Sequence, residues 1–295
     1  MPTRQIRGEE WGKFTPDYPD PDMITAVVGI STFGARRGYE GYHNTTTIHP
    51  NLKTAIAEAP TVSADILLEL NKSRLEVFPD LNSLPSHFTA SPLGLTDMAD
   101  GSKRKIHPLS YPLGDMSGIN AAIPEDYDAI RYSSIEEAIQ AVQRFGRDSI
   151  LIKRDFESAF RHILVSPIDT SLLGSQWEDA CYAERFLPFG LRTAPYLFNL
   201  FAEVVHWILK QQLKTANISA SIIHYHKHFL LVLDPGVIAH LKKSSEIFAT
   251  LCAQVGLSIK RSKNEIEDCS AFRRVDTRYL LQSSPLRVIL AAGNR

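Results

Sequence analysis

The sequence predicts an α+β protein in which an antiparallel β-sheet carries helices on one face. Two observations lead to this prediction. Residues 149–255 read as strand, helix, hairpin and helix in turn, and proline and glycine break the segment before them into short pieces. Of the 295 residues, 44% are apolar and 22% are charged, so the chain has enough apolar side chains for one large or two modest cores.

The first half of the chain changes character twice. Residues 1–50 are rich in Gly, Pro, Thr, Tyr and charge without a sustained period, which predicts an irregular lead-in. From 51 to 77 apolar residues recur every three or four positions and Pro60 interrupts them, which predicts two short helices. Residues 78–123 contain many prolines and glycines and predict short extended segments joined by turns.

The second half predicts more regular elements. Ser133 or Ser134 can cap a helix over 134–144, acidic residues occupy its first turn, and Gly146 ends it. Apolar and β-branched runs then predict a strand over 149–153, a long helix over 193–212, paired strands over 219–223 and 229–233, and a last helix over 237–255.

Charge and cysteine content restrict the functional classes. The formal net charge is −1, so binding to nucleic acid would have to rest on local basic patches. The three cysteines are odd in number and lack CxxC spacing, which fits a reducing compartment. No secretory signal and no run of about 18 apolar residues is present, so we expect a soluble, intracellular protein without membrane contact.

Three segments carry residues suited to chemistry. Asp155 lies where a strand passes into a helical turn, where a carboxylate can hold Mg²⁺, although Asp alone is more often a helix cap. Residues 186–199 form a Pro-Phe-Gly turn before a helix, and such a turn lets backbone approach an anionic ligand closely. Residues 223–232 form a hairpin with polar side chains at its tip.

In this order, the three segments resemble motifs A, B and C of the reverse transcriptase palm, specifically those of fungal retrotransposon enzymes of the DIRS type. The first reads Asp-Phe-Glu-Ser-Ala-Phe-Arg from Asp155, and the second reads Leu-Pro-Phe-Gly-Leu-Arg-Thr-Ala-Pro from Leu187. Residues 91–120 resemble the fingers strands, and 256–265 resemble motif D. The resemblance covers about residues 51–277 and implies an RNA-directed DNA polymerase with a right-hand fold.

The same resemblance implies a domain organisation. It places a fingers-like region at 51–147 and a palm-like region at 148–280, with 165–185 returning to the fingers as an open alternative. Residues 1–50 then form the lead-in and 281–295 a C-terminal tail. The family's thumb is expected to be truncated or absent.

Site roles follow from the resemblance, residue by residue. In the family, the first palm aspartate and the hairpin aspartates hold two Mg²⁺ ions for in-line phosphoryl transfer. Asp155 matches the first metal ligand, Arg104 the arginine that contacts triphosphate, and Lys263 the motif D lysine that protonates pyrophosphate. The implied partners are an RNA template, a DNA primer and a dNTP. The residues that the resemblance places around the nucleotide are Phe156 through its backbone carbonyl, Ala159, Phe160, Pro188, Phe189 and Gly190.

The hairpin departs from the family pattern. Where the family has Tyr-x-Asp-Asp, this chain reads Tyr225-His226-Lys227-His228. Lys227 and His228 replace two carboxylates by a cation and an imidazole, and Mg²⁺ requires hard oxygen ligands. We therefore predict that any Mg²⁺ binding is weak or lost and that the chain does not polymerise DNA. We also predict that Lys227 pairs with Asp155 in place of the metal.

Other interpretations of the same residues stay open. His224, His226 and His228 share one face of an extended strand and could bind Zn²⁺ or Cu²⁺, although histidines without a metal are the preferred interpretation. Basic clusters such as 103–105 could make the chain a non-catalytic nucleic-acid binder, and ordinary solvated charge explains them equally well. A translated transposon relic without function is a third possibility. The element type alone suggests the nucleus, and oligomeric state does not follow from the sequence.

Overall fold

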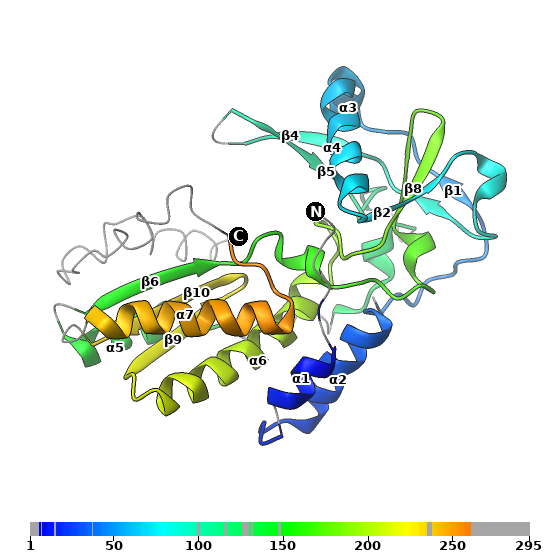
Figure 1. The fold of residues 1–295 in the computed structure, drawn as a ribbon. Helices are drawn as coiled ribbons and strands as arrows, with labels where there is room; N and C mark the ends of the chain where they lie inside the picture. The colour runs from blue at the N-terminus through cyan, green and yellow to red at the C-terminus, as the bar shows by residue number, and fades with distance from the viewer. Residues whose placement is uncertain are drawn as a thin grey trace. The chain divides into compact units, whose positions relative to one another are not determined.

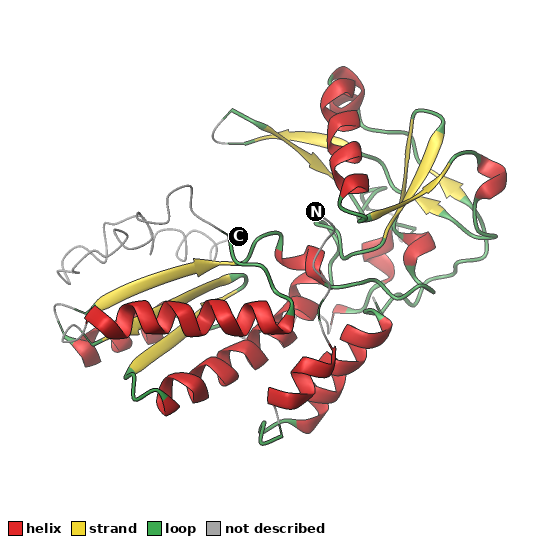
Figure 2. Cartoon of the chain, in the orientation of Figure 1, coloured by secondary structure: helices red, strands yellow, loops and turns green. Residues whose placement is uncertain are grey.

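A computed structural model describes most of the chain (Figures 1 and 2). The chain forms two compact units, each built from segments that are distant in sequence. The first unit contains Met1–Gly8, Ala26–Ala129 and Phe160–Phe198, and the second contains Glu9–Thr25, Ile130–Ala159 and Asn199–Arg295. The ranges given above for fingers-like and palm-like regions remain predictions. The residues that the structure describes are 6, 8–14, 16–36, 38–98, 101–114, 117–125, 130, 132–146, 149–234 and 238–260.

The first unit contains a five-stranded mixed sheet and a separate two-stranded ribbon. The sheet has the order β1-β3-β7-β8-β2, in which β1 and β7 flank β3 in parallel and the other neighbours are antiparallel. Its strands are β1 (Thr47–Ile48), β2 (Leu75–Phe78), β3 (Thr89–Ala90), β7 (Gly174–Trp177) and β8 (Ala180–Glu184). The ribbon pairs β4 (Gly94–Asp97) with β5 (Lys103–Ile106).

Two helices of the first unit confirm the prediction for most of residues 51–77, whereas residues 75–77 belong to strand β2. They are α3 (Lys53–Ala57) and α4 (Ala59–Asn71). Pro60 stands in the first turn of α4, where its missing N–H has no helical partner to lose. Apolar side chains of both helices form a buried core with Leu75, Leu93, Leu95 and Trp177. The short 3₁₀ helices are η1 (Leu81–Ser83), η2 (Ile119–Ala122), η4 (Ala159–His162) and η5 (Thr170–Leu172).

A buried ion-pair network lies in the core of the first unit. Arg161 donates to the Glu184 carboxylate through both terminal nitrogens and lies 3.6 Å from a Glu69 oxygen. Arg74 contacts the other Glu69 oxygen at 3.2 Å. Burial alone would raise the pKa of Glu184, but the Arg161 guanidinium holds it below its usual value. This network connects α4, β8 and η4.

The second unit contains a three-stranded antiparallel sheet in the order β6-β10-β9. The strands are β6 (Ile150–Asp155), β9 (Ala220–Tyr225) and β10 (His228–Leu233), close to the predicted ranges. β9 and β10 are joined by a two-residue turn, His226 and Lys227. The central strand β10 is almost entirely buried, because it pairs on both edges and its side chains pack against helices.

Helices cover both faces of this sheet (Figure 1). They are α5 (Ile135–Phe145), α6 (Ala194–Thr215), which begins in the first unit, and α7 (Ile238–Val255). On one face, Phe229 packs against Phe248 of α7, and His224 packs against His206 of α6. On the other face, Ile223, Leu230 and Val232 pack against α5. The prediction of helices on one face therefore holds for α6 and α7, and α5 is the exception.

Local sequence accounts for the ends of α5. The Ser134 hydroxyl accepts the Glu137 N–H, and the Glu137 carboxylate accepts the Ser134 N–H, which completes a capping box. Gly146 ends the helix with a φ of 83°, in the region that glycine adopts without a steric cost. The structure selects Ser134 over Ser133 as the cap and confirms the stop at Gly146, while the reciprocal bond of Glu137 goes beyond the prediction.

The N-terminal segment differs from the predicted irregular lead-in. It contains α1 (Gly8–Phe14) and α2 (Pro21–Phe33). Trp11 of α1 is fully buried and meets Phe201 of α6 edge-on at 5.2 Å, while Pro21 opens α2 at a position that proline favours. Tertiary contacts therefore stabilise a segment whose periodicity is weak. No helix among the described residues has the length and hydropathy that crossing a membrane requires.

Candidate functional site

The hairpin of the second unit places three predicted site residues together. His228 lies opposite Asp155 of β6 and opposite Tyr225 of β9. The turn residue His226 has a φ of 57°, a left-handed conformation that histidine adopts more readily than most side chains. Cross-strand neighbours on one face of a sheet have side chains within contact range. Asp155 therefore shares its surroundings with the two residues that replace the family's aspartates.

A cation and an imidazole contact the Asp155 carboxylate. The Lys227 amine nitrogen lies 3.6 Å from Asp155 Oδ1, and His228 Nδ1 lies 3.4 Å from the same oxygen. The first distance confirms the predicted Lys227–Asp155 pair. Burial lowers the pKa of His228 to about 4, so this imidazole is neutral near pH 7 and the positive charge facing Asp155 comes from Lys227.

This donor set does not fit a Mg²⁺ ion. Mg²⁺ takes oxygen ligands in near-octahedral geometry, whereas the hairpin offers one carboxylate, one ammonium and one imidazole. An ammonium within 4 Å of the carboxylate also occupies the place where a cation would be attracted. The ammonium neutralises the charge of the Asp155 carboxylate, but the hairpin provides no pair of carboxylates for a metal.

Backbone contacts fix the position of Asp155. The Phe156 N–H donates to the Lys227 carbonyl at 3.1 Å, and the Lys260 N–H donates to the Asp155 carbonyl at 2.8 Å. The Phe156 ring is buried, edge-on to Phe229 and tilted against Phe248. The side chain of Phe156 is therefore part of the core, and only its predicted backbone role concerns a ligand.

The first unit gathers five of the residues predicted to face a nucleotide. The Arg104 guanidinium lies over the Phe189 ring, 4.4 Å from its centroid, and Phe189 packs against Phe160 at 5.1 Å. Arg104 is exposed and Phe160 is buried, with Phe189 between them at 37% exposure. A cation stacked on an aromatic ring is held in place without neutralising its charge.

The Pro-Phe-Gly turn is fixed by its neighbours. Gly190 has a φ of 100°, and a Cβ added there would lie 2.6 Å from the His107 carbonyl oxygen, so no larger residue fits. The Asn120 side chain donates to the Gly190 carbonyl and accepts the Arg192 N–H. Pro188 is buried beside the turn. This role of Asn120 was not predicted from the sequence.

Comparisons with known proteins decide the family. The model of the family "Reverse transcriptase (RNA-dependent DNA polymerase)" matches residues 99–280, more than half of the chain. The chain belongs to the reverse transcriptase family. Its polymerases use divalent metal ions, typically Mg²⁺. No curated protein sequence matches the chain.

Solved structures support this reverse transcriptase fold. The native protease-reverse transcriptase of prototype foamy virus matches with a TM-score of 0.52 and 17% identity over 88% of this chain and 33% of its own. The foamy viral dRH form in complex with double-stranded DNA matches with a TM-score of 0.54 and 14% identity, over 88% of this chain and 44% of its own. The foamy viral enzyme in complex with an RNA/DNA hybrid matches with a TM-score of 0.53 and 14% identity, over 88% of this chain and 33% of its own. The chain thus spans less than half the length of these enzymes.

The structure brings the predicted site residues of this reverse transcriptase domain into two sets. One set lies in the first unit and the other in the second, and Lys263 lies outside the described residues. Ala159 is fully buried and is the last residue of the segment Ile130–Ala159 of the second unit. The first set is Arg104, Phe160, Pro188, Phe189 and Gly190, and the second is Asp155, Phe156, Ala159, Lys227 and His228.

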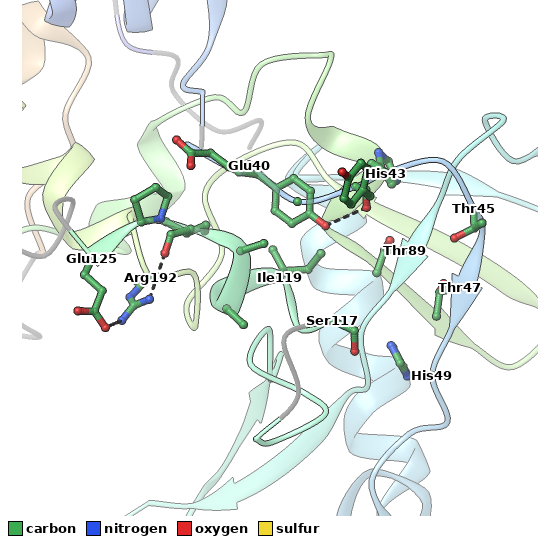
Figure 3. Close-up of a pocket in the computed structure, with 17 residues that line it drawn as sticks. Glu40, His43, Thr45, Thr47, His49, Thr89, Ser117, Ile119, Glu125 and Arg192 are labelled. Atoms are coloured by element: carbon green, nitrogen blue, oxygen red, sulfur yellow. Dashed lines mark hydrogen bonds and ion pairs between the residues drawn. The ribbon is translucent and has the colours of Figure 1, made fainter.

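The first unit also contains a cleft that the sequence did not predict (Figure 3). It measures about 960 Å³ and is lined mainly by residues 39–49 and 117–125. Arg192 at its edge donates to the Ile123 carbonyl at 3.1 Å and pairs with Glu125 at 3.6 Å. These contacts place the cleft beside the turn that contains Gly190. Its lining mixes acidic, imidazole and hydroxyl groups and has no motif that sequence reasoning recognises.

The three hairpin histidines do not form one metal site. His224 faces α6, where its ring contacts His206 and Asn199, whereas His228 contacts Asp155. The hypothesis that His224, His226 and His228 bind one metal is therefore wrong for this structure. Among the described residues, a different group has the spacing of metal ligands: Glu203, His206 and His224. Its signal in the sequence is the three-residue spacing of Glu203 and His206 on a helix.

Proposed function

We propose that this reverse transcriptase domain descends from a retrotransposon, of the DIRS type by its motifs, and does not polymerise DNA. The observation that carries the proposal is the Lys227 amine 3.6 Å from the Asp155 carboxylate. A lysine there replaces the charge of a metal but cannot bridge a primer hydroxyl and a triphosphate. His228 adds a neutral nitrogen ligand where the reaction needs an oxygen anion.

Primer extension tests this proposal. We expect no Mg²⁺-dependent extension by the natural chain on an RNA template with a DNA primer and dNTPs. The Lys227→Asp/His228→Asp variant restores three carboxylates at one corner of the sheet, and we expect measurable extension from it. His226 is kept because a Leu at a φ of 57° would be strained.

The controls separate catalysis from contamination and misfolding. Asp155→Ala added to the restored variant must abolish the recovered extension. Extension by the natural chain that disappears on Asp155→Ala would contradict the proposal directly. A folded restored variant that stays inactive with Mg²⁺ and Mn²⁺ would show that loss of activity does not rest on the hairpin pair.

A second function is non-catalytic binding to nucleic-acid duplexes. It is favoured by Arg104, which is exposed, stacked on Phe189 and without an acidic partner in the described part of the chain. Its neighbours differ, because Lys103 pairs with Asp97 at 2.9 Å and Lys105 with Asp65 at 2.8 Å. Foamy viral relatives have been solved in complex with double-stranded DNA and with an RNA/DNA hybrid, which supports testing both ligands.

Salt-dependent affinity tests the binding function. We expect Arg104→Ala to weaken binding to an RNA–DNA duplex and to reduce the slope of log affinity against log salt by about 1. Arg144→Ala is the matched control, since Arg144 is also exposed and stacked on a ring, that of Phe145. Equal effects of the two variants, or no binding by the natural chain, would leave a relic without function as the better account.

The element type also leads us to propose a nuclear location. A DIRS-type element acts on nuclear DNA, and the chain's partners would then be its template and primer. Imaging of a tagged chain tests this, and exclusion from the nucleus would contradict it.

A further inference from the structure

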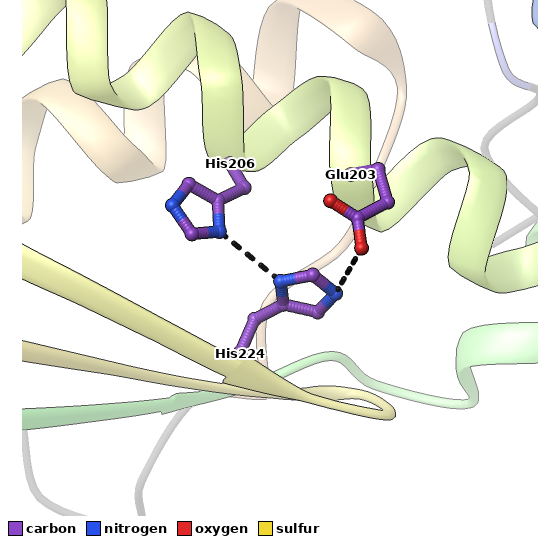
Figure 4. Close-up of side chains that lie close together, drawn as sticks. All are labelled: Glu203, His206 and His224. Atoms are coloured by element: carbon purple, nitrogen blue, oxygen red, sulfur yellow. Dashed lines mark hydrogen bonds and ion pairs between the residues drawn. The ribbon is translucent and has the colours of Figure 1, made fainter. Parts of the chain in front are cut away.

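A second cluster of titratable side chains lies between α6 and β9, away from Asp155 on the sheet. Asn199, Glu203 and His206 are spaced four and three residues apart, so they share one face of α6. His224 projects from β9 toward that face (Figure 4). It is 2% exposed, and Glu203 is 34% exposed, so the cluster is buried on the strand side and accessible on the helix side.

Hydrogen bonding determines which nitrogen of His224 is free. Its Nε2 faces two oxygens, Asn199 Oδ1 at 3.3 Å and Glu203 Oε1 at 3.5 Å, and therefore carries the proton. The Nδ1 atom of His224 then carries no proton and offers a lone pair. It faces His206 Nδ1 at 3.1 Å. The two Nδ1 atoms share a single proton when both imidazoles are neutral.

The proton between the two rings does not block a metal ion. An imidazole can carry its proton on either ring nitrogen, so the proton on His206 can move from Nδ1 to Nε2. Both Nδ1 atoms, which face each other at 3.1 Å, then offer a lone pair to a cation.

We propose that Glu203, His206 and His224 bind a transition-metal dication of the Zn²⁺ class. One ligand atom from each residue lies within 4.8 Å of the others. The 3.1 Å between the Nδ1 atoms is close to the edge of about 3.3 Å in a tetrahedron with Zn–N bonds of about 2.0–2.1 Å. Glu203 turns from His224 Nε2 to the metal as the third ligand, and water takes the fourth position.

Asn199 supplies the supporting contact that such sites usually have. Its Oδ1 accepts the His224 Nε2–H, which keeps the imidazole oriented while Nδ1 binds the metal. The Asn199 side chain also hydrogen-bonds the Glu203 carboxylate. Two imidazoles and one carboxylate favour Zn²⁺, Cu²⁺ or Ni²⁺ over Mg²⁺, which distinguishes this site from the metal requirement of a polymerase.

Isothermal titration of the folded, metal-free chain with Zn²⁺ tests the proposal. We expect saturable binding of one ion and a rise in the unfolding temperature on adding Zn²⁺. His206→Ala, at the accessible side of the cluster, weakens binding at least tenfold. Asn199→Ala weakens it by about 10- to 100-fold while leaving all three ligands in place. Co²⁺ in place of Zn²⁺ gives visible absorption of a tetrahedral site, which His206→Ala removes.

Controls show whether the ion occupies this cluster. His240→Ala on α7 is the matched histidine control, and Asp155→Asn removes the carboxylate of the hairpin site. Neither should change the Zn²⁺ affinity. Circular dichroism confirms that each variant is folded. The proposal is overturned if the folded natural chain shows no saturable Zn²⁺ binding, or if Asp155→Asn rather than His206→Ala abolishes it.

Discussion

The two sets of family-motif residues differ in what they have kept. The set in the first unit retains a stacked cation, an aromatic platform and a glycine turn that admits no side chain. The hairpin in the second unit retains strand register and a buried aromatic core, while its charge has changed sign at Lys227. The hairpin backbone therefore depends on apolar packing rather than on its carboxylates. On our proposal, the metal site has lost its ligands while the fold around it persists.

The sharpest test of this comparison is Phe229→Ala. Phe229 is fully buried in β10 against Phe156, Phe248 and His224. We expect the free energy of unfolding to fall by about 3–5 kcal/mol, because the substitution removes a large core side chain and leaves a cavity. Denaturant unfolding followed by circular dichroism measures it. Phe33→Ala, at a residue that is 75% exposed, should change stability by less than about 0.5 kcal/mol.

In the first unit, Gly190→Ala should have the next largest effect. The added Cβ would lie 2.6 Å from the His107 carbonyl oxygen in a backbone conformation with a φ of 100°. We expect a loss of about 2–3 kcal/mol, combining backbone strain and the clash. Gly146→Ala has a positive φ but nothing within 4 Å of the added Cβ, so it isolates the strain from the clash. Equal losses in the two variants would show that the turn is not closely packed.

Reversing the charge at the hairpin should cost less. In Lys227→Asp/His228→Asp, two new carboxylates face Asp155, and we expect about 2 kcal/mol of destabilisation without metal from their mutual repulsion. Mg²⁺ should restore stability in this variant and leave the natural chain unchanged. Thermal unfolding in EDTA and in Mg²⁺ measures both. Stabilisation of the natural chain by Mg²⁺ would contradict our account of the hairpin.

The smallest effect should be the pH dependence contributed by His228. Its pKa is about 4 in the folded chain and about 6.5 when unfolded, so the unfolded chain binds more protons between these values. The contribution of His228 to stability is present above pH 6.5 and is lost as the pH falls toward 4, by at most about 1.4 kcal/mol per pH unit. His228→Asn should flatten the stability curve in that window. A curve parallel to that of the natural chain would show that His228 is solvated.

Local signals predicted the helices and strands of the second unit well. The Ser134–Glu137 capping box, the stop at Gly146 and the two apolar runs around the hairpin are all visible within short windows of sequence. The fold class and the family followed from ordered motifs. The helices of the N-terminal segment did not, since Trp11 is stabilised by a residue almost two hundred positions away.

The candidate sites divide in the same way. The Lys227–Asp155 pair was predictable because the family pattern places metal ligands of one site at both positions. The cluster around His224 was not, because its partners lie on a helix whose pairing with the strand is set by the tertiary fold. Sequence spacing alone grouped His224 with His226 and His228, and strand geometry then directed His224 to the other side of the sheet from His228.

The buried Arg161 network has a consequence for how such chains are recognised. Arg161 ends the motif that begins with Asp155, yet it contacts Glu184 and Glu69 and serves the core. Removing one partner of a buried ion pair costs about 3–5 kcal/mol, so any lineage that must stay folded will tend to retain it. Part of the polymerase motif is therefore retained because the folded core requires it. On our proposal that this chain no longer polymerises DNA, the need to stay folded preserves a family motif beyond the reaction for which the family is named.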